Sequence, residues 1–183
     1  MFLLLIGSVY YNRRLYRIWC QRMIIREATE GDLPAVLAIL NHVIATSTSV
    51  YTETPSTLED RQAWLTSRRA RNFPALVAVA DRVRGFASFG DFRPWPGYAQ
   101  SVEHSVYVDE ASRGRGIGSA LLQRLIEEAR ARDMHVMIGG IDAENRASLA
   151  LHAKFGFTEV GRLREVARKF DSWLDLVFVQ RMI

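Results

Sequence analysis

The sequence predicts a single α/β domain in which helices cover both faces of a mixed β-sheet. Runs with the apolar spacing of amphipathic helices alternate along the chain with short runs typical of strands. The resulting order is β-α-α-β-β-β-α-β-α-β-β, which combines hairpins with strand–helix–strand crossovers. Near the middle of the chain, a glycine-rich turn joins a strand directly to a helix.

The first third of the domain is predicted to hold one strand and two helices. Residues 24–28 have strand character, and the turn that follows ends at Asp32, a residue type that caps helices. Apolar residues then recur at helical spacing: Leu33, Val36, Leu37, Leu40, Val43 and Ile44. Residues 57–60 resemble a capping box for a second helix, which extends to about Arg71. The loop between the helices, residues 46–57, is long enough to contribute to a site.

The middle of the domain is predicted to be built from strands. Residues 75–80 and 85–92 form a hairpin around a short polar turn. The next segment, residues 93–98, contains two prolines, which remove hydrogen-bond donors from a strand, so we expect an aromatic loop there. Residues 100–108 resume as a strand that leads into the glycine-rich turn.

The last third is predicted to alternate helices with strands. The helix after the glycine-rich turn has a buried stripe: Ile117, Leu121, Leu122, Leu125, Ile126 and Ala129. Residues 135–141 form a strand, after which Asn145 caps a shorter helix that Gly156 ends. Two further strands, residues 157–166 and 173–182, complete the sheet.

The positive charge of the chain is concentrated near its N-terminus. The formal net charge of +4 comes from arginines that have no acidic residue among them: Arg13, Arg14, Arg17 and Arg22. Residues 23–183 are therefore neutral, and the charge does not indicate a nucleic-acid partner. We expect residues 1–22 to be an extension outside the fold, either disordered or the result of an upstream start, with residues 23–183 as the single domain. A weak membrane-surface anchor is the alternative for the extension.

Targeting features are weak in this sequence. Residues 2–6 are apolar but far too short to span a bilayer, and they lack the flanking features of a signal peptide. A single cysteine, Cys20, permits no intrachain disulfide, which fits a reducing compartment. We therefore expect a cytoplasmic protein without a transmembrane span.

The glycine-rich turn at residues 113–118 is suited to bind a phosphate or pyrophosphate. It begins at Arg113 and carries glycines at alternate positions, namely Gly114, Gly116 and Gly118. Glycines let backbone N–H groups approach an anion closely, and the first turn of the next helix adds unpaired donors with a partial positive charge. The spacing matches neither the Rossmann fingerprint nor the P-loop.

The pattern Arg-x-x-Gly-x-Gly in this turn resembles the signature of the GNAT acetyltransferases, whose loop grips the pyrophosphate of acetyl-coenzyme A. Residues 145–157 are similar to the family's second cofactor motif, Asn-x-x-Ala/Ser-x-x-Leu-Tyr-x-x-x-Gly-Phe, whose asparagine typically contacts the pantetheine arm. The resemblance implies the GNAT fold, with three layers α/β/α around a mixed sheet, and acetyl-coenzyme A as co-substrate. The cofactor-binding residues that it implies are Val106, Tyr107, Val108, Arg113, Gly114, Arg115, Gly116, Ile117, Gly118, Ser119, Asn145 and Ser148.

Three further segments, residues 85–93, 102–108 and 169–175, look like the phosphinothricin and methionine sulfoximine N-acetyltransferase branch of that family. With them, the resemblance covers essentially residues 23–183. It implies a homodimer and the direct transfer of acetyl to the free amine of a small amino-acid analogue: phosphinothricin, methionine sulfoximine or methionine sulfone. The alternatives are a GNAT enzyme for a protein N-terminus, a polyamine or an antibiotic, and a non-catalytic module that binds acetyl-coenzyme A.

Glu103 and His152 are the predicted catalytic residues. An alkyl ammonium must lose a proton before it attacks a thioester, and a partly buried carboxylate is a suitable base. Glu103 occupies the position that the branch uses as base. His152 stands where most of the superfamily has tyrosine and the branch has histidine, and we expect it to hydrogen-bond the tetrahedral intermediate or the thiolate. The alternatives are a solvated glutamate paired with an arginine and a packed helix histidine.

The oxyanion of the intermediate needs a hydrogen-bond donor. The family fold implies that a bulge opens the strand that carries Glu103, so that the N–H of Val106 or Val108 is available. His104 adjoins Glu103, so it points to the opposite face of a regular strand, and we expect it to be structural.

The aromatic loop is predicted to select the acceptor. The expected substrate-binding residues are Arg93, Trp95, Gly97 and Tyr98. A guanidinium such as that of Arg93 binds a carboxylate bidentately, although a surface salt bridge is the alternative. The aromatic residues also suit the core or a dimer contact. Lys169 and Phe170 complete either the pocket or a subunit interface.

Two classes of chemistry are not indicated by the sequence. The histidines and Cys20 show no paired metal-ligand spacing, so we expect no metal. The serines near the motifs lie in no nucleophile elbow, which argues against a hydrolase: Ser88, Ser105 and Ser148.

Overall fold

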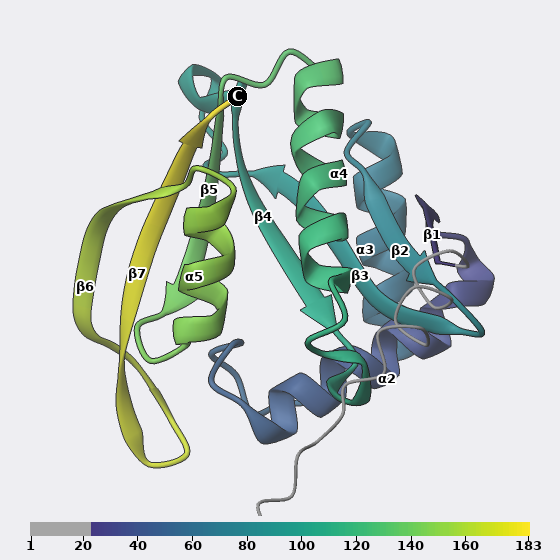
Figure 1. The fold of residues 1–183 in the computed structure, drawn as a ribbon, viewed down its shortest axis with the longest axis horizontal. Coiled ribbons are helices and arrows are strands. Elements are labelled where there is room, and N and C mark those ends of the chain that lie inside the picture. Colours follow the sequence, from purple (N-terminus) through teal and green to yellow (C-terminus); the bar gives the residue numbers. More distant parts are fainter. Residues whose placement is uncertain (1–22) are drawn as a thin grey trace, which may run out of the picture.

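A computed structural model describes residues 23–183, which form one seven-stranded sheet between two layers of helices (Figure 1). The predictions for residues 1–22 lie outside the described residues. The strands are β1 (Ile24–Glu27), β2 (Ala75–Val79), β3 (Val83–Asp91), β4 (Ser101–Val108), β5 (Val136–Asp142), β6 (Thr158–Lys169) and β7 (Ser172–Met182). Their order across the sheet is β1-β2-β3-β4-β5-β7-β6, and only the central pair, β4 and β5, is parallel. The predicted mixed α/β sheet is confirmed.

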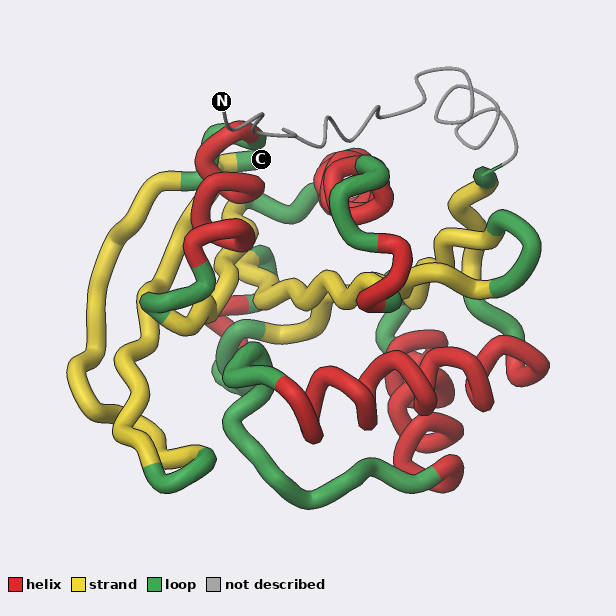
Figure 2. Tube along the Cα trace, turned by 60° about the horizontal axis from the view of Figure 1, so that its bottom comes forward, coloured by secondary structure: helices red, strands yellow, loops and turns green. Residues whose placement is uncertain are grey.

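Each face of the sheet is covered by two helices and has its own hydrophobic core (Figure 2). The helices are α2 (Leu33–Thr46), α3 (Leu58–Ala70), α4 (Ile117–Ala131) and α5 (Arg146–Lys154). Helices α2 and α3 pack on one face, and α4 and α5 pack on the other. The predicted stripe of α4 is fully buried, with each of its six residues at most 1% exposed. The capping box that begins α3 is also confirmed.

The last hairpin is longer than the sequence predicts. Strand β6 continues to Lys169, three residues beyond the predicted end, and pairs there with Ser172 at the start of β7. The two turn residues, Phe170 and Asp171, have positive φ angles of 48° and 59°, as a type I′ hairpin turn requires. Neither residue is the glycine or asparagine that normally signals this turn, so sequence reasoning placed the end of the strand too early.

Asp32 does not cap α2 in the simple way that the sequence suggests. A 3-10 turn at Glu30–Asp32 precedes the helix, and Asp32 forms a reciprocal capping box with Thr29. Its carboxylate accepts hydrogen bonds from the Thr29 N–H and hydroxyl (2.8 Å each) and from two nitrogens of Arg26 (2.7 and 2.8 Å). The bonds from the Arg26 guanidinium are the main reason that the pKa of Asp32 lies well below its usual range.

Replacing this carboxylate tests its contribution to folding. We expect Asp32→Ala to lower the free energy of unfolding by about 2 kcal/mol at pH 7, because charge-assisted hydrogen bonds are lost. Since the pKa of Asp32 is depressed in the folded state, its contribution is present at neutral pH and is lost as the pH falls below about 4. Urea unfolding at pH 7 and pH 3.5 should therefore show that the difference in free energy of unfolding between wild type and Asp32→Ala is smaller at the lower pH. Glu59→Ala, an exposed acidic change, serves as the control, and an equal difference at both pH values would contradict the prediction.

Candidate active site

The site begins where the two central strands separate. Strands β4 and β5 pair only from Ser101 and Val136 to Glu103 and Ile138, although both continue for several residues (Figure 1). Strand β4 stays in unbroken register with β3 from Val102 to Val108. The prediction of a bulge in β4 is therefore wrong. The sheet opens instead because β5 diverges from β4.

Backbone hydrogen bonds show which residues of β4 face this opening. The Gln100 carbonyl accepts from the Val136 N–H (3.2 Å), on the β5 side. The Asp109 N–H donates to the Arg84 carbonyl (2.9 Å), on the β3 side. Because these directions alternate along a strand, the even-numbered residues of β4 direct their backbone groups toward β5. The N–H groups of Val106 and Val108 thus point into the gap, beyond the last residue pair that joins the two strands.

A cleft of about 910 Å³ extends from this gap across the glycine-rich turn to the start of α5. All the predicted cofactor-binding residues except Arg115 line it. Gly114 and Gly116 have φ angles of 73° and 82°, which side-chain-bearing residues rarely adopt, so the turn requires glycine at both positions. Gly116 directly precedes α4, so unpaired N–H groups of the first helical turn lie beside the cleft.

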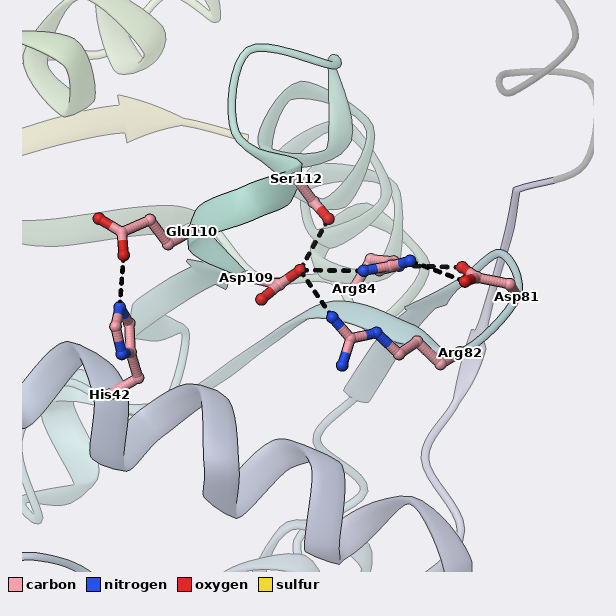
Figure 3. A network of polar contacts seen from close by, with 7 residues as sticks. All are labelled: His42, Asp81, Arg82, Arg84, Asp109, Glu110 and Ser112. Atoms are coloured by element: carbon pink, nitrogen blue, oxygen red, sulfur yellow. Dashed lines mark hydrogen bonds and ion pairs between the residues drawn. The ribbon is translucent and has the colours of Figure 1, made fainter.

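A polar network holds the base of the glycine-rich turn in place (Figure 3). Asp109 accepts a hydrogen bond from the Ser112 hydroxyl (2.8 Å) and pairs with Arg84 (3.2 Å) of the β2–β3 hairpin. The next residue, Glu110, contacts His42 of α2 (Nε2 to Oε2, 2.7 Å). Burial by itself raises the pKa of Asp109, but Ser112 and the arginines together lower it. The turn is thus tied to elements on two sides before any ligand binds.

The loop after α2 forms another wall of the cleft, as its length suggested. Residues 46–49 line the cleft, and Ser49 Oγ accepts a hydrogen bond from the Asn145 amide (3.2 Å). Asn145 also caps α5 as predicted, accepting from the Ser148 N–H (3.1 Å). The Thr48 hydroxyl donates to the buried carboxylate of Asp142. Sequence reasoning missed Thr48 and Asp142, because 94 residues separate them and no spacing pattern links them.

Lys169 anchors the same loop from the far end of the chain. Its side chain is buried, and Nζ donates to the carbonyls of Ile44 (2.6 Å), Ser47 (2.6 Å) and Val50 (2.9 Å). Burial lowers the pKa of this amine. The neighbouring Phe170 lines the cleft. Two roles were predicted for Lys169 and Phe170, completion of the pocket or of a subunit interface, and their positions support the first.

Glu103 lies on the α2/α3 face of the sheet, beside the gap. Its carboxylate lies over Gly140, a residue of the cleft wall: a Cβ atom added to Gly140 would lie 3.4 Å from Glu103 Oε1. Among the residues that the structure describes, nothing donates a hydrogen bond to this carboxylate, so it is not the arginine-paired glutamate considered above. Burial raises the pKa of Glu103, and the charge of Arg93 partly opposes this shift.

Only part of the aromatic loop, residues 93–98, packs against the face of the sheet that carries Glu103. Arg93 stacks on Phe92, with its guanidinium carbon 4.2 Å from the ring centroid, and it forms no ion pair within residues 23–183. Phe92 in turn packs against Tyr98 (5.9 Å between centroids) and Phe178 of β7 (6.5 Å). Trp95 is 69% exposed. A Cβ atom added to Gly97 would meet nothing within 4 Å, and none of the four predicted substrate-binding residues lines the cleft.

His152 is buried on α5 and lines the cleft, a position compatible with both predicted alternatives, a packed helix histidine and a hydrogen-bond partner of the intermediate or thiolate. Its Nδ1 lies 2.7 Å from the Ser148 carbonyl, and its Nε2 lies 2.8 Å from Nε2 of His104. His104 points away from Glu103 as predicted, and its Nδ1 lies 2.7 Å from the Ile138 carbonyl. The contact between the two imidazoles was not predicted, because 48 residues separate them.

Two further observations bear on ligands and location. Residues 23–183 contain no group of three or more histidine, cysteine, aspartate or glutamate side chains placed to hold a metal ion. Within the same range, no helix has the length and apolar character needed to cross a bilayer.

Comparison with known proteins places this geometry in a family. Residues 37–157 match the model of the acetyltransferase (GNAT) family. An L-methionine sulfoximine/L-methionine sulfone acetyltransferase from Pseudomonas aeruginosa is 48% identical over 158 residues, which cover 85% of this chain and 92% of the relative. The chain therefore belongs to the GNAT family of acetyltransferases, and acetyl-coenzyme A is its co-substrate.

Two solved structures share the fold closely. A ribosomal-protein-alanine N-acetyltransferase from Brucella melitensis has a TM-score of 0.86 and 50% identity, covering 87% of this chain and 99% of its own. A phosphinothricin acetyltransferase from Sinorhizobium meliloti, solved in complex with acetyl-coenzyme A, has a TM-score of 0.86 and 30% identity, covering 88% and 89%. The predicted GNAT fold is thereby confirmed.

The three bonds from Lys169 give a testable prediction for the cleft wall. We expect Lys169→Met, which keeps the length of the side chain, to lower the free energy of unfolding by about 3 kcal/mol, because three carbonyls, one buried and two partly buried, lose their donor. Affinity for coenzyme A should fall as the loop loosens. Chemical unfolding and calorimetry measure the two effects. Lys154→Met changes an exposed lysine and should alter neither, and wild-type behaviour of Lys169→Met would contradict the prediction.

Proposed function

We propose that this enzyme acetylates the free amine of a small amino-acid analogue of the methionine sulfoximine, methionine sulfone or phosphinothricin type. The observation that carries the proposal is the position of Glu103, a half-buried carboxylate without a hydrogen-bond partner in the described chain, beside the gap between β4 and β5. The named activity of the 48% identical Pseudomonas relative supports this choice of acceptor.

The proposed roles divide between the two faces of the sheet. Acetyl-coenzyme A supplies an acetyl group already activated as a thioester. The predicted cofactor-binding residues hold its pyrophosphate and pantetheine along the cleft, and the N–H of Val106 or Val108 donates to the developing oxyanion. Glu103 accepts the proton of the acceptor amine, directly or through one water. His152, on the other face, hydrogen-bonds the intermediate or the thiolate.

Arg93 is the proposed partner for the carboxylate of the acceptor. Its guanidinium has no carboxylate partner within the described residues, and its charge acts on Glu103, so an amino acid can bridge the two side chains. Tyr98 would border the side-chain pocket, whereas the exposed Trp95 and Gly97 would contribute only if a ligand or a second subunit covers them.

A protein N-terminus is the second candidate acceptor, favoured by the 50% identical structure described as a ribosomal-protein-alanine N-acetyltransferase. The two acceptors differ in one chemical group. A free amino acid carries an α-carboxylate for Arg93, whereas the first residue of a peptide does not.

We further propose that the enzyme is a cytoplasmic homodimer. Strand β6 is an edge of the sheet, and its hairpin exposes large apolar side chains: Val160, Leu163, Val166 and Trp173, each at least 44% exposed. A second copy of the chain would cover this edge, which otherwise invites aggregation.

Sedimentation of Leu163→Glu should show monomers at concentrations where the wild type is a dimer.

An amine panel tests the choice of acceptor. Coenzyme A release should be strong with methionine sulfoximine, methionine sulfone or phosphinothricin, and weak with alanyl peptides and polyamines. Arg93→Met should raise KM for methionine sulfoximine about tenfold or more, because a bidentate charged contact is lost. Arg93→Met should not change the turnover of the amide of methionine sulfoximine, because the amide lacks the carboxylate that Arg93 is proposed to bind. Strong turnover of a peptide or polyamine with none of methionine sulfoximine would exclude the proposed acceptor.

The pH profile tests Glu103 as the base. Because burial raises the pKa of Glu103, kcat/KM should fall as the pH drops through a value above 4.5, its ordinary pKa. Glu103→Gln should lower kcat about 10² to 10³-fold and remove this limb. Arg93→Met should move the limb to higher pH, since the charge of Arg93 lowers the pKa. A transfer rate unchanged in Glu103→Gln, with coenzyme A binding intact, would contradict the assignment.

A further inference from the structure

The contacts of His104 and His152 require more protons than two neutral imidazoles carry. A neutral imidazole has one N–H and one bare nitrogen. Each Nδ1 lies 2.7 Å from a backbone carbonyl, that of Ile138 for His104 and that of Ser148 for His152. Since carbonyls only accept hydrogen bonds, each Nδ1 must carry a proton. The two Nε2 atoms, 2.8 Å apart, are then both bare and repel each other.

No neutral arrangement of the pair satisfies all three contacts. If His104 donates through Nε2, its bare Nδ1 faces the Ile138 carbonyl, and if His152 does so, its bare Nδ1 faces the Ser148 carbonyl. The Ser148 hydroxyl lies 3.4 Å from His152 Nδ1, farther than the 2.7 Å of the carbonyl, and is too distant to compensate. A third proton, held between the two Nε2 atoms, turns every contact into a hydrogen bond.

The surroundings of the pair favour a positive charge. The centroid of the Phe157 ring lies 5.2 Å from the centroid of each imidazole, so an aromatic ring packs against both members of the pair. His152 lies in the last turn of α5, where the free carbonyls carry partial negative charge. Burial acts in the opposite sense and lowers the pKa of both histidines, that of His104 to about 3. The bonds to the Ile138 and Ser148 carbonyls raise the pKa values of the two histidines but only partly offset burial. No lysine, arginine, aspartate or glutamate of residues 23–183 forms a hydrogen bond or ion pair with either ring.

We propose that His104 and His152 share one additional proton between their Nε2 atoms, and that this pair protonates the thiolate of coenzyme A as it leaves. The mechanistic part rests on the proposed function. The amine nitrogen first bonds to the acetyl carbon and forms the tetrahedral intermediate; as this collapses, the carbon–sulfur bond breaks, and its electron pair stays on sulfur. The nitrogen loses two protons, one before it attacks and one after the new bond has formed, and each passes through Glu103 to water. The proton of the pair passes to sulfur, and a proton from solvent restores the pair.

The fold brings this proton to the cleft and places the two histidines in different roles. Both imidazoles line the cleft that carries the predicted cofactor residues. His152 is the proposed acid, and His104 is a positioning residue that acts through it. Gly139 permits the arrangement, because a Cβ atom there would lie 2.8 Å from Cε1 of His104.

Nitrogen NMR counts the protons without any activity measurement. The chain has four histidines, so a sample labelled with ¹⁵N-histidine gives a simple spectrum, in which His42 and His135 serve as exposed references. At pH 7 we expect both Nδ1 atoms of the pair to be protonated and a single proton to be shared by the two Nε2 atoms. A bare Nδ1 on either ring would overturn the proposal.

Kinetics of His104→Asn then test the role in transfer. Asparagine retains an N–H for the Ile138 carbonyl but cannot share a proton with His152. In the wild type, kcat should fall at high pH, because the pair then loses its shared proton. In His104→Asn we expect kcat to be about 10²-fold lower, KM for both substrates to change by less than about threefold, and this fall at high pH to be absent. His135→Asn, an exposed control, should behave as wild type.

The outcomes separate the two proposals. Wild-type kcat and pH profile in a folded His104→Asn would overturn the role of the pair. A wild-type chain that transfers no acetyl to any amine would overturn the proposed function, and the proton count would still decide whether the pair is charged.

Discussion

The arrangement of the molecule depends on the point at which β4 and β5 stop pairing. Hydrogen-bonded strands normally stay together, because unpaired backbone groups are costly. Here the imidazole of His104 lies at the end of the paired region, bonded to the Ile138 carbonyl and packed over Gly139. Beyond it, backbone donors of β4 are left for a ligand. The same residue that ends the pairing thus belongs to the proposed proton-carrying pair.

This separation gives each side of the sheet its own chemistry. Glu103 and His104 are neighbours in sequence, yet strand geometry sends their side chains to opposite faces. On one face, a carboxylate with a raised pKa lies near the aromatic loop, and on the other, two imidazoles line the proposed cofactor cleft. In the proposed mechanism, proton removal and proton return therefore take place on different faces of the sheet, so the two groups do not neutralise each other.

The fold and the cofactor cleft were largely predictable, because their signals are local. Helical spacing located the buried stripe of α4, and the alternate glycines located the turn before it. Contacts between distant segments were not predictable: His104 with His152, Thr48 with Asp142, and Lys169 with the loop after α2. The bulge expected in β4 was carried over from the family, and the opening arises instead from the path of β5. The acceptor residues stay a prediction, since only some of the aromatic loop lies near Glu103.

The three bonds of Lys169 also set an order of events during synthesis of the chain. They join residues 119 to 125 positions apart, so the lysine emerges from the ribosome long after the loop that it anchors. Until the final hairpin closes, three carbonyls in and beside the loop that forms one wall of the cleft lack this donor. Since contacts of such long range form slowly, a nascent or C-terminally truncated chain would contain the glycine-rich turn and still lack a finished cleft. We therefore expect acetyl-coenzyme A to bind only after the final hairpin has closed.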